Sequence, residues 1–89
     1  GTYTATLLFG TGLHSCGGLA VHGADLYVSD TKANAVLRAP LDGSGDLVPF
    51  ARGLDRPGPI ATQGKHLYIK ESRRISRIPL HTTWSYKRS

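Results

Sequence analysis

Cysteine, tryptophan and methionine are scarce in this 89-residue sequence, which has one cysteine (Cys16), one tryptophan and no methionine. A single cysteine excludes an intramolecular disulfide framework. No apolar run approaches the roughly 20 residues that a helical membrane span needs. No charged-then-apolar leader opens the sequence, so we expect any secretion signal to be absent or already removed. These absences leave one small domain, without a membrane partner, of undetermined location.

Acidic residues are also few, and the net charge of +5 is unevenly distributed. Residues 1–45 carry a formal charge of −1, whereas residues 46–89 carry +6. A basic half is typical of proteins that contact nucleic acid, acidic glycans or acidic protein surfaces. No aromatic-flanked basic helix or nucleic-acid-binding motif accompanies the charge. We therefore expect a solvated basic face and no nucleic-acid partner.

Helical periodicity is missing throughout, and this absence favours an all-β fold. Eleven glycines and five prolines separate short apolar runs, which is typical of strands joined by tight turns. Pro49 lies inside one run and cannot donate to a ladder, so residues 47–51 should form an edge strand. The expected strands are 18–22, 26–30, 35–39 and 47–51, followed by 60–62, 66–71 and 74–78.

An internal repeat organises these strands. Many residues recur 41 positions later and, after a two-residue deletion, 39 positions later. The first offset relates Phe9, Gly12, Leu13, Ala20, Gly23, Leu26 and Tyr27 to Phe50, Gly53, Leu54, Ala61, Gly64, Leu67 and Tyr68, and the second relates Arg38, Pro40 and Leu41 to Arg77, Pro79 and Leu80. The chain is therefore about two copies of one unit.

Each unit of about 40 residues has the size of a four-stranded β-propeller blade. The segments Leu26–Asp30, Leu41–Gly45 and Gly53–Pro57 resemble blades of six-bladed propellers of the YWTD, NHL and gluconolactonase-like types. The resemblance covers about residues 7–80 and implies two four-stranded antiparallel blades. It implies little about activity, because these families include receptors, scaffolds, lactonases and lyases.

Two blades cannot close a ring, since a closed propeller needs at least about four. We expect homo-oligomerisation to complete it, with a trimer giving six blades, or companion segments of a longer chain to do so. The whole chain is then one two-blade module: residues 17–52 and 58–80 form the blades, 1–13 supply an outer strand that completes a blade, and 81–89 form a tail. The opening strand is expected over residues 4–9.

His14 and Cys16 precede the first strand of the first unit, a position near the central tunnel of a propeller. Imidazole and thiolate are good ligands for zinc or copper. The pair lacks a family spacing, however, so we expect no metal or other cofactor and favour a small buried cysteine. Arg56 occupies the equivalent region of the second unit. It is a candidate to bind an anionic ligand, or else to bridge Asp55 or a neighbouring acidic residue.

Asp30 and Glu71 occupy equivalent positions after the second strand of each unit. In the resembled blades such an acidic residue braces the following turn through hydrogen bonds. No nucleophile elbow, phosphate loop or zinc motif occurs, so no catalytic residue is assigned. The predicted function is a self-assembling scaffold or ligand-binding surface. Two alternatives stay open, a fragment of a larger propeller lactonase, hydrolase or lyase, and a glycan-binding lectin.

Overall fold

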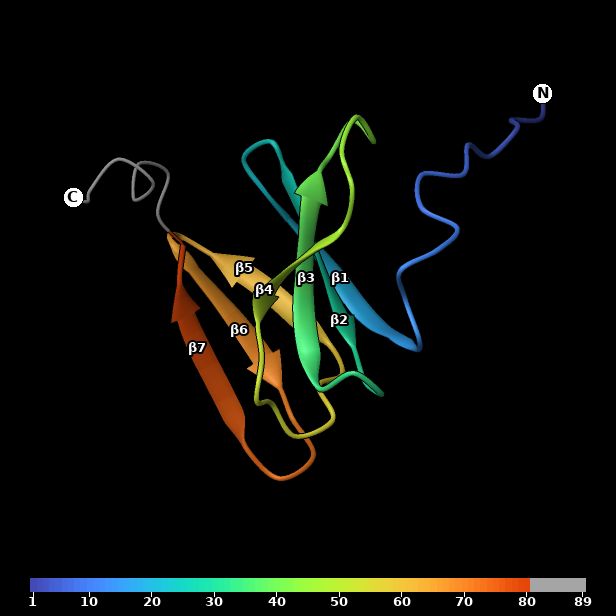
Figure 1. Ribbon diagram of the computed structural model, residues 1–89. Coiled ribbons are helices and arrows are strands. Elements are labelled where there is room, and N and C mark those ends of the chain that lie inside the picture. The colour runs from blue at the N-terminus through green and yellow to red at the C-terminus, as the bar shows by residue number, and fades with distance from the viewer. Residues whose placement is uncertain (81–89) are drawn as a thin grey trace.

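The computed structural model describes residues 1–80, which form two antiparallel sheets and contain no helix (Figure 1). The first sheet has the order β1 (Cys16–His22), β2 (Asp25–Asp30), β3 (Ala35–Pro40) and β4 (Val48–Ala51). The second has the order β5 (Ile60–Gln63), β6 (His66–Lys70) and β7 (Ile75–Pro79). No helix in the described part could therefore cross a membrane. The prediction of an all-β, antiparallel fold is confirmed.

The strands differ from the expected ranges mainly at the edges. β4 lies at the outer edge of its sheet, as Pro49 predicts. β1 starts at Cys16 rather than Gly18, because an irregularity between these residues lets the strand continue its pairing with β2. β6 stops at Lys70, which leaves Glu71 at the start of the turn. The second sheet has three strands within residues 1–80, and the tail at 81–89 lies outside the described residues.

Strand register reproduces both offsets of the sequence repeat. Leu19 pairs with Val28 across β1 and β2, and Ile60 pairs with Ile69 across β5 and β6, each 41 residues later. Tyr27 pairs with Arg38, and Tyr68 pairs with Arg77. The two tyrosines are 41 residues apart, whereas the two arginines are 39 residues apart. The strands β5, β6 and β7 are thus equivalent to β1, β2 and β3, and the deletion falls between β6 and β7.

The core lies between the two sheets and joins faces that are not equivalent. Tyr27 and Val36 of the first sheet form a buried cluster with Leu67, Ile69 and Leu80. Leu26 and Val28 are the repeat equivalents of Leu67 and Ile69. They alternate with Tyr27 along β2, so they lie on the other face of the first sheet, where they are also buried. Equivalent faces of the two sheets therefore point in the same direction, so that one face of the first sheet packs against the opposite face of the second.

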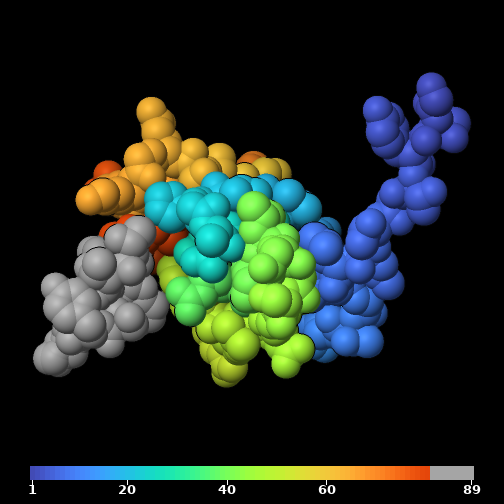
Figure 2. Space-filling model, turned by 90° about the horizontal axis from the view of Figure 1, so that it is seen from above, coloured from blue at the N-terminus to red at the C-terminus, as the bar shows by residue number. Residues whose placement is uncertain are grey.

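Residues 1–9 join neither sheet, and the N-terminal part of this segment extends away from the body (Figures 1 and 2). Tyr3 is 100% exposed and Leu7 81% exposed. The strand expected at residues 4–9 is absent from the single chain, because the outer edge of β3 is already occupied by β4. That these residues complete a blade elsewhere stays a prediction.

Candidate functional site

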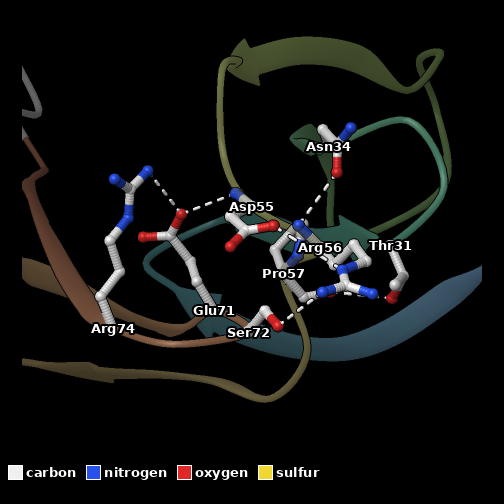
Figure 3. Close-up of polar contacts among 8 residues, drawn as sticks. All are labelled: Thr31, Asn34, Asp55, Arg56, Pro57, Glu71, Ser72 and Arg74. Atoms are coloured by element: carbon white, nitrogen blue, oxygen red, sulfur yellow. Dashed lines mark hydrogen bonds and ion pairs between the residues drawn. The ribbon is translucent and has the colours of Figure 1, made fainter.

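Polar contacts between the sheets gather where the loop that leads into β5 meets the turns after β2 and β6 (Figure 3). The first entry loop, residues 10–15, leads into β1, and the second entry loop, residues 52–59, leads into β5. The β2–β3 turn covers residues 31–34, and the β6–β7 turn covers residues 71–74. His14 and Arg56 lie on the entry loops and Cys16 directly follows one, so this region contains all three predicted site residues.

A buried carboxylate ties the first entry loop to the β2–β3 turn. Asp30 is fully buried and accepts hydrogen bonds from three backbone N–H groups. The donors are His14 at 2.7 Å, Ser15 at 3.1 Å and Ala33 at 3.1 Å. Burial raises the pKa of Asp30, but the donors from His14, Ala33 and Ser15 outweigh it and hold the pKa below its ordinary value. Asp30 therefore braces both the turn, as predicted, and the loop.

Glu71 has the equivalent role in the second unit with different partners. Its carboxylate accepts from the backbone N–H of Asp55 at 2.7 Å and from the hydroxyl of Ser76. Arg74 forms an ion pair with it at 2.9 Å. The pKa of Glu71 is lowered from 4.5 to about 2, mainly by the Arg74 guanidinium and then by Ser76 and Asp55, while burial acts in the opposite direction. Both carboxylates are therefore structural in this arrangement.

Hydrogen bonds from the first unit hold the second entry loop. Ser29 donates its hydroxyl to the carbonyl of Gly58 at 2.6 Å, and Thr31 donates to the carbonyl of Pro57 at 2.8 Å. A Cβ at Gly17 would come within 2.8 Å of the Pro57 carbonyl oxygen. Glycine is required there because this close approach leaves no room for a side chain.

Arg56 joins the two turns. Its backbone adopts a left-handed φ of 48°, and its N–H donates to Asn34 Oδ1 at 2.9 Å. Its guanidinium donates to Ser72 Oγ at 2.8 Å and lies 3.7 Å from Asp55. Arg56 therefore bridges Asp55, one of the two roles expected from the sequence. Its side chain is 64% exposed, so its face toward solvent is open to a ligand as well.

His14 lines a shallow hollow of about 360 Å³ beside the first sheet. Its Nδ1 lies 3.3 Å from Asp30 Oδ2, while the side chain is 71% exposed. Leu37, Leu47 and Arg52 also line the hollow. The arrangement combines an imidazole and a guanidinium with apolar walls.

Cys16 is exposed, so the expectation of a buried cysteine was wrong. β1 is the edge strand of its sheet, and Cys16 begins that strand where the entry loop joins it, outside the core between the sheets. Within residues 1–80, no three His, Cys, Asp or Glu side chains gather closely enough to hold a metal ion. Cys16 and His14 are thus near each other in sequence without forming such a cluster.

Sequence comparison gives no family for this chain: no protein-family model matches it, and no curated protein matches it. Sequence reasoning also missed Ser29, Thr31 and Asn34, which connect the units. Only Asn34 carries a local signal, since asparagine tolerates the left-handed φ of 56° that it adopts. The partners of Ser29 and Thr31 lie 29 and 26 residues away, and no local pattern marks such contacts.

Proposed function

We propose that this chain is a β-propeller module whose two sheets are neighbouring blades of a ring completed by further copies. Three copies would give six blades, the number in the families that the sequence resembles. The assembled ring serves as a scaffold and presents a ligand-binding surface at the end where the entry loops lie.

The stacking of nonequivalent faces is the observation that carries this proposal. A two-sheet sandwich with internal two-fold symmetry would bring equivalent faces together, whereas here the Tyr27 face meets the Leu67 and Ile69 face. A contact between unlike faces is heterologous, and it can be repeated until a rotation closes it into a ring. Thr62 of β5 also donates its hydroxyl to the Val21 carbonyl of β1 at 3.0 Å, which supports adjacent first strands around a common axis.

Sedimentation equilibrium of the purified chain tests the assembly. The expected mass corresponds to about three copies, with a mass independent of concentration once the ring is closed. A well-folded monomer at the highest concentration measured would overturn the proposal. A ring formed only after addition of other propeller segments would favour the fragment of a larger enzyme.

The surface around the entry loops supplies the binding part of the proposal. The side chains of His14, Cys16 and Arg56 are all exposed there, and Arg56 favours an anionic ligand. Titration with a sulfated glycan and with its unsulfated parent, followed by amide chemical shifts, tests this role. Shifts at Arg56 with the sulfated glycan alone support an anionic ligand. Equal shifts with both glycans favour a lectin, and no shifts leave the scaffold role alone.

A further inference from the structure

We propose that residues 7–10 of a second copy of this chain pair with β7 and become the fourth strand of the second sheet. This inference rests on the proposed function and names the interface through which the ring forms.

Within residues 1–80, two segments are open to pairing with a further strand. Within residues 1–80, β7 pairs with β6 alone, and Ile75 at its start is 76% exposed. Leu7 is 81% exposed and Leu8 44% exposed, in an apolar stretch that joins no sheet. A free strand edge is a template for another extended segment, and an exposed apolar segment gains by joining one.

Chain connection decides which copy supplies the strand. β4 passes through the second entry loop into β5, so it belongs to the sheet that precedes the one it leads into. Residues 7–10 pass through the first entry loop into β1 in the same way, so they belong to a sheet that precedes the first. Figures 1 and 2 place residues 1–9 and β7 at opposite sides of the molecule, which excludes pairing within one copy.

The repeat also gives the register. Leu37 pairs with Pro49, and Arg38 pairs with Val48, across β3 and β4. The β7 equivalents of Leu37 and Arg38 lie 39 residues later and are Ser76 and Arg77. The equivalents of Pro49 and Val48 lie 41 residues earlier and are Leu8 and Leu7. The expected pairs are therefore Ser76 with Leu8 and Arg77 with Leu7. No other register keeps the equivalence of the two units.

Three side chains that pack where β4 joins the first sheet recur in the proposed contact between residues 7–10 and the second sheet. The Tyr27 ring packs edge-on against Phe50, with ring centroids 5.0 Å apart, and the Arg38 guanidinium lies 5.7 Å from the Phe50 centroid. Their repeat equivalents are Tyr68, Arg77 and Phe9, identical in residue type. The docked copy would therefore place Phe9 against Tyr68 and beneath Arg77, a contact that edge-to-face and cation–π attraction favour.

A pair of single-cysteine variants tests the register. In a Cys16→Ser background, Leu7→Cys and Arg77→Cys proteins are prepared separately, mixed, and oxidised mildly. Directly opposed residues in an antiparallel pair have Cα atoms about 4.5–5.5 Å apart, within the range of a disulfide. We expect the mixture to give a disulfide-linked dimer on a non-reducing denaturing gel, and a protein with both substitutions to give linked species up to three chains.

The first matched control uses the pairing of β3 with β4 inside one chain. Arg38→Cys with Val48→Cys has the same register relation inside one chain, so it should lose its free thiols without linking chains. Mixing Leu8→Cys with Arg77→Cys moves one side chain to the other face and should give at least about tenfold less linked dimer.

Solution mass separates the possible failures. If the reduced variants have the parent's oligomeric mass but Leu7 and Arg77 do not link while the internal pair does, this inference is wrong and the proposed function stands. If the parent is a monomer, both fail. Linked species longer than three chains support the pairing and show that the assembly stays open.

Truncation gives a second readout that needs no cysteine. Deleting residues 1–10 should convert the oligomer to smaller species, because it removes the strand and Phe9. Deleting residues 86–89 should leave the oligomer intact. Equal masses for the two truncated proteins would overturn the strand exchange.

Discussion

The two sheets of this protein perform the same local task with different chemistry. In the first, fully buried Asp30 collects three backbone donors from an entry loop and a turn. In the second, the stretch from Glu71 to Arg77 is two residues shorter than the equivalent stretch from Asp30 to Arg38. Glu71 collects one backbone donor and two side chains, Ser76 and Arg74. The extra methylene of glutamate lengthens the carboxylate's reach, which offsets the altered turn. The brace is therefore preserved although the side chains that make it are not.

Removal of a leucine between the sheets should give the largest effect and shows how far the sheets depend on each other. Leu67 is 0% exposed within the core cluster. Leu67→Ala should lower the free energy of unfolding by about 2–5 kcal/mol, through lost transfer energy and a residual cavity. Urea denaturation measures this loss, and sedimentation should show dissociation or aggregation, because the substitution is repeated in every copy.

Leu26 and Lys65 are the comparison for Leu67. Leu26→Ala acts on the opposite face of the first sheet and should also weaken assembly, whereas Lys65→Ala lies in an exposed turn and should change stability by less than about 0.5 kcal/mol. Leucine variants that melt within about one degree of the parent would contradict the core assignment of these strands.

Truncation of each carboxylate should separate the two braces. Asp30→Ala leaves three backbone N–H groups without their acceptor, and we expect a loss of about 3 kcal/mol or more. Glu71→Ala leaves one such group, while the 58%-exposed Arg74 can turn to water, so the loss should be about 1–3 kcal/mol. Urea midpoints of the two variants, measured at neutral pH, decide the order. A larger loss for Glu71→Ala would contradict the backbone-donor argument.

Acidification should expose the contribution of Glu71 by itself. Its pKa is lowered from 4.5 to about 2 in the folded chain, so the stabilisation by its charge is complete above pH 4.5 and is lost as the pH falls toward 2. The stability difference between the parent and Glu71→Gln should be largest near neutral pH and shrink across this window. A constant difference from pH 7 to pH 2 would show that the charge contributes nothing.

The smallest expected effect concerns Asn34, which has no equivalent in the shorter stretch after Glu71. Asn34→Gly keeps the left-handed backbone but removes the acceptor for Arg56 N–H, and should cost about 1 kcal/mol. Asn34→Ala removes the acceptor and strains the φ of 56°, so its loss should be larger by about 1 kcal/mol. Equal losses in urea denaturation would show that backbone strain at this turn is negligible.

The strands and their order could be predicted because both depend on local patterns. Two-residue alternation marks β2 and β6. Gly23 and Gly64, whose φ is near 60°, mark the turns that precede these two strands. The offsets of 41 and 39 relate the two units. Cys16 could not be placed in this way, because its exposure depends on an irregularity in its pairing with β2. The bridge from Arg56 to Asn34 likewise joins residues 22 positions apart. Its geometry exists only after the two sheets have stacked.

Pro49 has a consequence for the growth of the sheets. It lies within the outermost strand of the first sheet and has no N–H to donate, so a fifth strand added beyond β4 would meet a gap in the ladder. A segment from a stray chain therefore finds a poor template at this outer margin. Pro49 in this way disfavours, at the β4 edge, the lateral strand addition that begins amyloid formation.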